Sequence, residues 1–311
     1  MNTPFPAKTA SRTKCPTPTT SMRSPRRPTS PTARARVVNS FYLAALWGAG
    51  TAWALDNGLA LHPPMGWRSW NCYHGDVKDA DIRATIDVMV GKTRLVDGKA
   101  ASLADMGYFH VGVDDGWQAC GTGWDKSFHA QDGSPLVNRT KFSDLQSLVS
   151  YGHSHKLKMG WYDDNCICMD SYALRANASW AERAYIGDVR QILDAGFDGV
   201  KIDNCGDDDG SGFASRVQHI NASGTALVIE NSNQAHGHGP PRGVPVDPEG
   251  WCNYNLFRSG GDIGPDFGNV ISKLQTTLPF LGNGTSKPIS RPGCWAYPDM
   301  LEGGCCGCTC C

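Results

Sequence analysis

The chain has 311 residues, 29 of them basic and 30 acidic, and its formal net charge is −1. This balance excludes the strongly basic surface that nucleic-acid binding needs, so no nucleic-acid partner is expected. The length is sufficient for one large barrel or for two ordinary domains.

The amino-terminal region differs from the rest of the chain in composition. Residues 1–55 hold eight of the basic side chains and none of the acidic ones, and they are rich in Ser, Thr and Pro, which cannot build a hydrophobic core. The apolar stretch at 41–54 is too short to span a bilayer and ends in a small-x-small pattern, Ala52-Trp53-Ala54. We therefore predict that 1–54 is a basic tail with a signal peptide; a signal anchor and an organelle transit peptide are the alternatives.

Cysteine usage indicates the same compartment. The chain has 13 cysteines and four Asn-x-Ser/Thr sequons, which begin at Asn138, Asn177, Asn221 and Asn283. Disulfides and N-linked glycans both form in the secretory pathway. We therefore expect a secreted or lumenal glycoprotein with disulfide bonds.

From residue 55 onward, short apolar runs alternate with helical stretches. Seven runs are typical of strands, at 63–71, 108–117, 157–165, 198–204, 225–231, 254–262 and 293–300. Five segments between them are typical of helices, at 79–106, 142–155, 180–195, 211–220 and 267–277. Alternating strands and helices form parallel βα units, and no glycine-rich phosphate loop follows the first run, as it would in a dinucleotide-binding sheet. The predicted fold is α/β, a (β/α)8 TIM barrel over 55–302 in which seven βα units are recognisable.

The run GVKIDNCG at 199–206 indicates which faces its residues occupy. Alternate side chains of a strand point to opposite faces, so Val200 and Ile202 point one way and Lys201, Asp203 and Cys205 the other. A lysine beside an aspartate on one face indicates a face that meets substrate or water.

Polar side chains end most of the seven runs. The carboxylates among them are Asp114, Asp115, Asp163, Asp164, Asp203, Glu230, Asp262 and Asp299. In a barrel the active site lies at the carboxyl ends of the strands, so these groups would converge on one mouth. The side chains expected to join them are Trp70, Trp117, Tyr162, Lys201 and Arg258. Carboxylates accept hydrogen bonds from sugar hydroxyls and aromatic rings pack on sugar faces, so the sequence predicts a carbohydrate site with paired carboxylates for glycoside cleavage.

Six motifs make this prediction specific: MGWRSWN, DDGW, GWY, VKIDNC, FRSGGDI and PDML, in this order over 56–302. With them the sequence resembles glycoside hydrolase family 27, the α-galactosidase and α-N-acetylgalactosaminidase family. The resemblance implies an eighth βα unit and then a β-sandwich domain. Instead, the chain continues into a Cys-rich stretch at 303–311 that resembles no family segment, so we expect a barrel truncated before its eighth strand.

The resemblance implies a role for each matching residue. Asp203 matches the nucleophile, and Asp262, four residues after Arg258, matches the acid/base. Asp114 and Asp115 match the pair that binds the 4- and 6-hydroxyls of galactose. The other sugar-contacting positions are Trp70, Tyr162, Lys201, Arg258, Asp299 and Met300.

Two further expectations concern neighbouring strand ends. Glu230 follows the fifth run, where the family reads the sugar 2-substituent, and a bulky acid there suits a free 2-hydroxyl better than an N-acetyl group. Cys205 resembles the half-cystine beside the nucleophile, at the pocket, and its partner would be Cys166 or Cys168.

The resemblance therefore implies a retaining α-galactosidase that uses no metal or organic cofactor. Its substrates would be α-galactoside oligosaccharides, glycolipids or glycoproteins, and a homodimer is compatible with the resemblance. The alternatives are a related specificity, for N-acetylgalactosamine or β-L-arabinopyranose, a galactoside-binding protein without catalysis, and a truncated gene product without function.

Overall fold

The computed structural model describes residues 57–164, 166–203, 211–232, 252–282 and 288–301. The predicted tail at 1–54, the Cys-rich stretch at 303–311 and Cys205 lie outside these ranges, so the expectations for them stay predictions. Within the described ranges, no helix is both long and apolar enough to cross a membrane.

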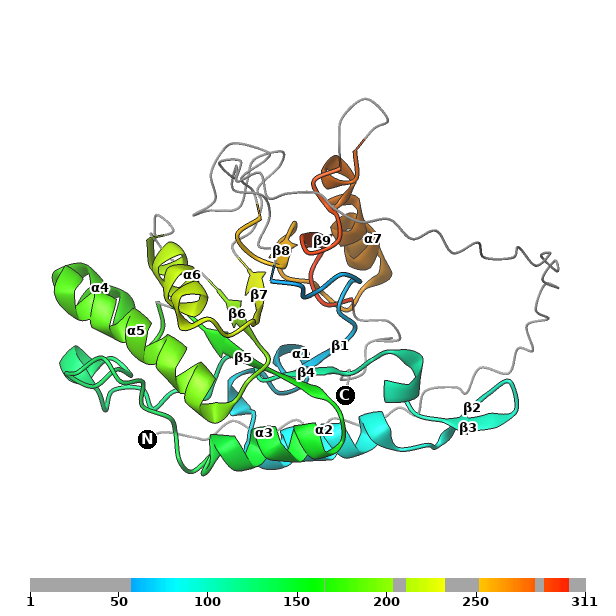
Figure 1. Cartoon of the computed structure of the whole chain (residues 1–311), viewed down its shortest axis with the longest axis horizontal. Coiled ribbons are helices and arrows are strands. Elements are labelled where there is room, and N and C mark those ends of the chain that lie inside the picture. Colours follow the sequence, from blue (N-terminus) through cyan, green and yellow to red (C-terminus); the bar gives the residue numbers. More distant parts are fainter. Residues whose placement is uncertain (1–56, 165, 204–210, 233–251, 283–287, 302–311) are drawn as a thin grey trace, which may run out of the picture. The chain divides into compact units, whose positions relative to one another are not determined.

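Seven strands form one parallel sheet in the order β1-β4-β5-β6-β7-β8-β9 (Figure 1). They are β1 (Gly66–Arg68), β4 (His110–Gly112), β5 (Lys158–Asp163), β6 (Gly199–Ile202), β7 (Val228–Asn231), β8 (Leu256–Arg258) and β9 (Trp295–Tyr297). Each strand lies within one of the seven predicted runs and pairs with the next. Sequential parallel pairing is the connectivity of a (β/α) barrel. Among the described residues, no strand closes the barrel between β1 and β9.

Helices flank the sheet, and several of them pack beside one another (Figure 1). They are α1 (Trp70–Tyr73), α2 (Asp79–Val90), α3 (Leu145–Ser154), α4 (Asp170–Ala176), α5 (Ala178–Ala195), α6 (Ser211–Ser223) and α7 (Phe267–Gln275). α2 contacts α3, α3 contacts α5 and α5 contacts α6, so these four helices form a continuous layer. The predicted fold class, an incomplete α/β barrel, is confirmed.

Local sequence explains where the helices begin. Asp144, Asn177 and Asp266 precede α3, α5 and α7, and the side chain of each accepts a hydrogen bond from the backbone N–H three residues later. Short polar side chains at this position satisfy N–H groups that have no partner inside the helix. These caps place the helix starts within three residues of the predicted ones.

One predicted helix is wrong over its second half. The pattern suggested a single helix over 79–106, whereas α2 ends at Val90 and an antiparallel hairpin follows, β2 (Arg94–Val96) and β3 (Lys99–Ala101). Asp97 and Gly98 form its turn, with φ angles of 50° and 75°. An Asp-Gly pair with positive φ at both positions favours a two-residue hairpin turn, and this preference outweighs the helical pattern of the flanking residues.

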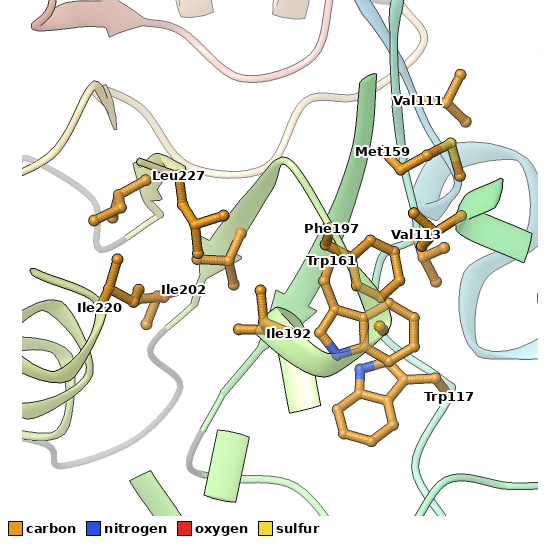
Figure 2. Close-up of a cluster of buried hydrophobic side chains, with 14 of the residues drawn as sticks. Val111, Val113, Trp117, Met159, Trp161, Ile192, Phe197, Ile202, Ile220 and Leu227 are labelled. Carbon is orange, nitrogen blue, oxygen red and sulfur yellow. The ribbon is translucent and has the colours of Figure 1, made fainter. Parts of the chain in front are cut away.

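The hydrophobic core lies between the sheet and the helices (Figure 2). Val200 and Ile202 of β6 are buried in it, as their alternation predicted. The ring of Trp161 on β5 stacks on Phe197 and lies beside Trp117, with ring centroids 4.7 Å and 4.8 Å apart. Because alternate residues of each strand enter this core, the intervening charged residues face the interior of the barrel.

A disulfide joins the segments that lead into β8 and β9. Cys252 and Cys294 are bonded, 42 residues apart, and both are buried. A cross-link of this kind restricts the unfolded chain more than the folded one and so stabilises the fold. The prediction of disulfide bonds is confirmed.

Candidate active site

The carboxyl ends of the strands enclose a cavity of about 140 Å³. Its lining residues are Arg68, Trp70, Asn71, Asp114, Asp115, Tyr162, Ile167, Lys201, Asp203, Arg258, Asp262, Asp299 and Met300. Of the twelve residues for which the family resemblance implies a place at the site, ten are among them; Glu230 is not, and Cys205 lies outside the described residues. The strand ends thus converge as expected for a barrel, and the geometry of the lining indicates what chemistry it supports.

Asp203 lies directly after β6 and is surrounded by donors. The hydroxyl of Tyr162 donates to its Oδ2 at 3.3 Å, and Nζ of Lys201 lies 3.6 Å from the same oxygen. A guanidinium nitrogen of Arg258 lies 3.9 Å from Oδ1. The side chain is 20% exposed, so it is held in place without being closed off from a ligand. Two nearby cations favour the ionised form, which is the form that attacks as a nucleophile.

Arg258 joins two carboxylates. Its Nη1 donates to Oδ1 of Asp262 at 2.9 Å, while Nη2 approaches Asp203. Burial opposes the charge of the guanidinium, but Tyr297 and Asp203 outweigh burial and raise the pKa of Arg258. The Asp262 side chain is 76% exposed. One cation therefore links a recessed carboxylate to one that faces solvent.

Asp114, just after β4, is held from several directions. Nζ of Lys201 donates to its Oδ2 at 3.0 Å, and the backbone N–H of Asp115 donates to its Oδ1 at 2.9 Å. Its own N–H donates to the hydroxyl of Ser69. Burial opposes the charge of the Lys201 ammonium, but Asp114 and Asp203 raise its pKa above the ordinary value. Lys201 is therefore charged and is shared by two carboxylates.

Two carboxyl groups of the lining ionise less readily. Burial, followed by the charge of Asp114, raises the pKa of Asp115. Burial also raises the pKa of Asp299, although its carboxylate accepts hydrogen bonds from the N–H groups of Ile263 and Met300, both at 2.8 Å. These bonds hold the segment after β9 against the loop after β8.

Glu230 does not line the cavity. Its Oε2 forms an ion pair with Arg68 at 2.7 Å, and its Oε1 accepts a hydrogen bond from the hydroxyl of Tyr297. Both carboxylate oxygens are engaged inside the barrel, so the expected contact with a sugar 2-substituent has no support in this geometry.

Trp117 also lies elsewhere, and its placement at the mouth of the barrel is wrong. Its ring is buried in the core, and Nε1 donates to the carbonyl of Tyr162 at 2.8 Å. The preceding Gly116 has a φ of 106°, so the chain turns there and strand alternation does not continue to Trp117.

Three lining residues were not predicted: Arg68, Asn71 and Ile167. Alternation along the first run would have placed Arg68 on the inner face, because the adjacent apolar residue, Trp67, packs against the core on the other face. The sequence has no comparable pattern for Asn71 or Ile167, which lie after the strands.

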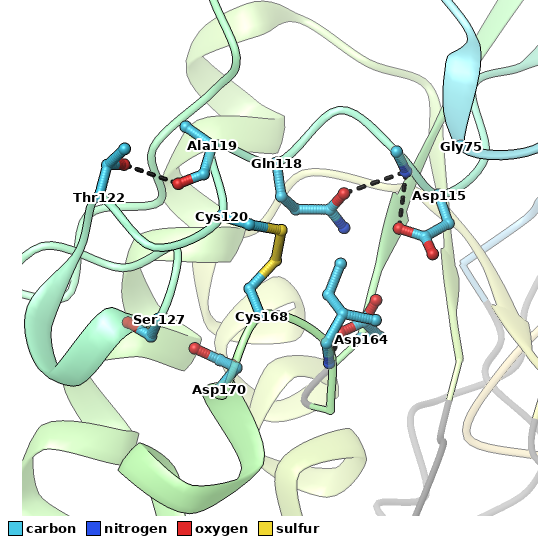
Figure 3. The surroundings of a disulfide bond; sticks show 12 residues. Gly75, Asp115, Gln118, Ala119, Cys120, Thr122, Ser127, Asp164, Cys168 and Asp170 are labelled. Carbon is cyan, nitrogen blue, oxygen red and sulfur yellow. Dashed lines mark hydrogen bonds between the residues drawn. A yellow bond between two sulfur atoms is a disulfide. The ribbon is translucent and has the colours of Figure 1, made fainter. Parts of the chain in front are cut away.

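A disulfide beside the cavity holds the segment after β5 (Figure 3). Cys120, in the loop after β4, is bonded to Cys168, which precedes α4. The alternative that pairs Cys205 with Cys168 is therefore wrong, because the Cys168 sulfur already has a partner. Cys166 is also disulfide-bonded, and its pairing with Cys205 stays a prediction because Cys205 lies outside the described residues.

The donor groups of the cavity suit a polyhydroxylated ligand. No group of three or more His, Cys, Asp or Glu side chains in the described part of the chain could hold a metal ion. Carboxyl groups of differing exposure lie beside aromatic side chains. Such a set can bind hydroxyls, form a covalent bond and transfer a proton, which are the steps of glycoside hydrolysis.

Comparison with known proteins agrees with this geometry. The family model described as Alpha galactosidase A matches residues 62–310. Alpha-galactosidase 2 of Arabidopsis thaliana is 29% identical over 253 residues, which cover 80% of this chain and 56% of that protein. The alpha-N-acetylgalactosaminidase of Gallus gallus is 27% identical over 79% of this chain and 59% of its own length. The chain thus spans little more than half the length of these relatives.

A solved structure agrees on the fold. The α-galactosidase MEL1 of Saccharomyces cerevisiae matches with a TM-score of 0.59 and 19% identity, covering 82% of this chain and 55% of that one. Together with the family model, this match confirms the resemblance to glycoside hydrolase family 27 and the barrel architecture.

Proposed function

Because the chain belongs to the α-galactosidase A family of glycoside hydrolases, we propose that it removes terminal α-linked galactose with retention of configuration. The observation that carries the proposal is the placement of Asp203 and Asp262 on the one guanidinium of Arg258 at the cavity. The carboxyl groups of a retaining pair lie about 5–5.5 Å apart, and two carboxylates that contact one cation are compatible with that separation.

In the first step, a carboxylate oxygen of Asp203 attacks the anomeric carbon while Asp262 protonates the glycosidic oxygen. The carbon–oxygen bond to the leaving group breaks and a β-galactosyl ester of Asp203 forms. In the second step, Asp262 takes a proton from water, and the water oxygen attacks the anomeric carbon. The ester bond breaks, α-galactose leaves and both carboxyl groups return to their initial state. The exposure of Asp262 supports its role, because the leaving group departs into solvent and the attacking water arrives from solvent.

Galactose recognition is assigned to the remaining lining residues. Asp114 and Asp115 would accept hydrogen bonds from the 4- and 6-hydroxyls, with Trp70 against the apolar face of the ring. Lys201 and Tyr162, which contact Asp203, would keep the nucleophile ionised and oriented. The axial 4-hydroxyl distinguishes galactose from glucose, so the two aspartates would determine which sugar binds.

A second specificity, for α-linked N-acetylgalactosamine, is favoured by one observation. Glu230 was expected to exclude an N-acetyl group, yet its carboxylate is bonded to Arg68 and Tyr297 and does not line the cavity. Neither assignment excludes a galactoside-binding protein that lacks hydrolytic activity, and such a protein is the third candidate.

The test is hydrolysis of paired nitrophenyl glycosides by the full chain. We expect nitrophenol release from the α-galactoside, with α-galactose as the first product by NMR. Faster release from the α-N-acetylgalactosaminide would reverse the specificity, and β-galactose as the first product would exclude the double displacement. Galactose binding by calorimetry with no release from either substrate would identify the binding protein.

The setting of the activity is part of the same proposal. Two disulfides among the described residues fit an oxidising compartment, which supports a secreted or lumenal location. The substrate would be an α-galactoside oligosaccharide, glycolipid or glycoprotein. The homodimer allowed by the family resemblance stays a prediction, and sedimentation velocity would test it.

A further inference from the structure

Arg68 lines the cavity, and two glycines make room for its side chain. A Cβ atom at Gly112, its partner on β4, would lie 2.9 Å from Cζ of Arg68, and one at Gly160 on β5 would lie 3.9 Å from Nη2. The guanidinium therefore extends across the inner face of the sheet. There Nη1 donates to the carbonyls of Val113, at 3.2 Å, and Trp161, at 3.4 Å. These contacts hold the side chain in one orientation.

The far end of Arg68 neutralises Glu230 on β7. Nη2 donates to Oε2 of Glu230 at 2.7 Å, and the side chains of both residues are at most 10% exposed. Tyr297 of β9 donates to the other oxygen. A buried carboxylate without a nearby cation is costly, so the ion pair with Arg68 compensates the burial of Glu230.

Lys201 is the cation next to Glu230 on the adjacent strand. The two residues are paired in the register between β6 and β7, so their side chains leave the same face. Lys201 instead reaches Asp114 at 3.0 Å and Asp203 at 3.6 Å. Glu230 is thus a third carboxylate on the face from which Lys201 reaches Asp114 and Asp203, and in this structure Glu230 pairs with Arg68 instead. Arg68 also supports Asp114 directly, since its Nε lies 3.8 Å from Oδ2.

We propose that Arg68 is a positioning residue for sugar binding: by holding Glu230, it leaves the ammonium of Lys201 on Asp114 and Asp203. The inference rests on the proposed function, in which Asp114 binds sugar hydroxyls and Asp203 is the nucleophile. Without Arg68, Glu230 draws Lys201 toward β7, and Asp114 loses the donor that orients its carboxylate. The result is a displaced hydroxyl acceptor in an otherwise intact cavity.

The test compares Arg68→Met with the double variant Arg68→Met/Glu230→Gln in the full chain. For the nitrophenyl α-galactoside, we expect Arg68→Met to raise KM by about 10- to 100-fold, with a smaller fall in kcat, because a displacement near 1 Å in a binding group can cost about 100-fold. The double variant removes the competing charge, so its KM should return to within about threefold of the wild type. The matched control is Arg83→Met, which breaks the surface pair with Asp79 and should leave both constants unchanged.

The outcomes separate this inference from the proposed function. An active wild type whose Arg68→Met variant keeps its KM, or whose double variant is no better than the single one, overturns the inference alone. A wild type inactive on both nitrophenyl substrates overturns the proposed function and the inference with it. If Arg68→Met does not fold, Arg68→Gln, which keeps donors for the two carbonyls, replaces it in the same comparison with Glu230→Gln.

Discussion

Two clusters of charged side chains contact residues at the end of β5, and they differ in how far their groups are open to solvent. The cavity cluster comprises Asp114, Lys201, Asp203, Arg258 and Asp262. The buried cluster comprises His129, Asp170, Asp188 and Arg216. Both combine aspartates with cations, so residue type alone does not distinguish them.

The buried cluster is closed to solvent and its cations are saturated. Nδ1 and Nε2 of His129 lie 2.9 Å from Asp170 and 2.7 Å from Asp188. Arg216 donates to Asp188 through Nε at 2.9 Å and to the carbonyl of Asp164 through Nη2 at 2.8 Å. Burial opposes the charge of His129, but Asp188 and Asp170 raise its pKa to about 10. The cluster thus ties α4, α5 and α6 to the end of β5.

The comparison shows that exposure, more than the presence of charge, marks the reactive site. In the cavity cluster, the side chain of Asp203 is 20% exposed and that of Asp262 is 76% exposed. A ligand can therefore compete for these groups. In the buried cluster every nitrogen of His129 already has a partner at 0% exposure. Strong electrostatic perturbation occurs in both, which is why it identifies a site only together with access.

The largest expected effect is that of Asp203→Asn. An amide cannot form the glycosyl ester, so turnover of the nitrophenyl α-galactoside should fall by at least about 10⁴-fold. Galactose binding, measured by calorimetry, should persist because Asp114 and Asp115 are unchanged. Full activity in this variant would remove Asp203 from the mechanism, and with it the distinction between the two clusters.

Asp262→Asn should have a smaller effect that depends on the leaving group. Loss of general acid catalysis costs about 10²- to 10⁴-fold, and less where the leaving group needs no proton. Added azide should rescue the second step by attacking the β-galactosyl ester in place of water and give α-galactosyl azide, identified by NMR. Equal losses for nitrophenyl and alkyl galactosides, with no azide product, would contradict the acid/base assignment.

Arg216→Met should change stability while sparing chemistry. Removing Arg216 leaves Asp188 with His129 as its remaining charged partner in the cluster and should lower the free energy of unfolding by about 3–5 kcal/mol in denaturant titrations. The kcat of the folded fraction should stay within about threefold of the wild type. Arg83→Met, which breaks an exposed pair on α2, is the control and should cost less than about 1 kcal/mol. A large fall in kcat without a change in stability would place the buried cluster in the mechanism.

The smallest expected effect is the pH dependence of stability. The pKa of His129 is about 10 in the folded state and near its ordinary value of 6.5 when unfolded, so the stability it contributes is complete below pH 6.5 and is lost as the pH rises toward 10. Between pH 7 and 8.5 this group should cost about 2 kcal/mol. Asp164 acts in the same direction, since burial, followed by the charge of Asp115, raises its pKa to about 8.

Urea titrations at the two pH values measure this decline. His129→Gln should be less stable than the wild type at pH 7 and should lack most of the further loss up to pH 8.5. A wild-type protein that becomes more stable over this interval would show that the histidine does not carry its charge in the folded state.

Local patterns in the sequence determined the strands and much of the cavity lining. Period-two alternation separates Val200 and Ile202, which enter the core, from Lys201 and Asp203, which face the barrel. This separation is a property of extended backbone and needs no tertiary information. The barrel rule then brings residues from distant strand ends to one mouth, since parallel strands all end on the same side. Asp97 and Gly98 form an equally local turn pattern, but the helical periodicity of the flanking residues led to the prediction of a helix there.

Only the tertiary structure decided which charged groups pair with one another. Asp114 and Glu230 are both acidic residues at strand ends, yet Lys201 on β6 contacts Asp114. Glu230 on β7 pairs instead with Arg68 on β1, although β4, β5 and β6 lie between these two strands. Likewise, the bond between Cys120 and Cys168 depends on where two loops meet. Alternation assigns a side chain to a face but not to a partner on that face. Pairing is set by distances across the inner surface of the sheet, where an arginine can reach past nearer neighbours because Gly112 and Gly160 leave room for its side chain.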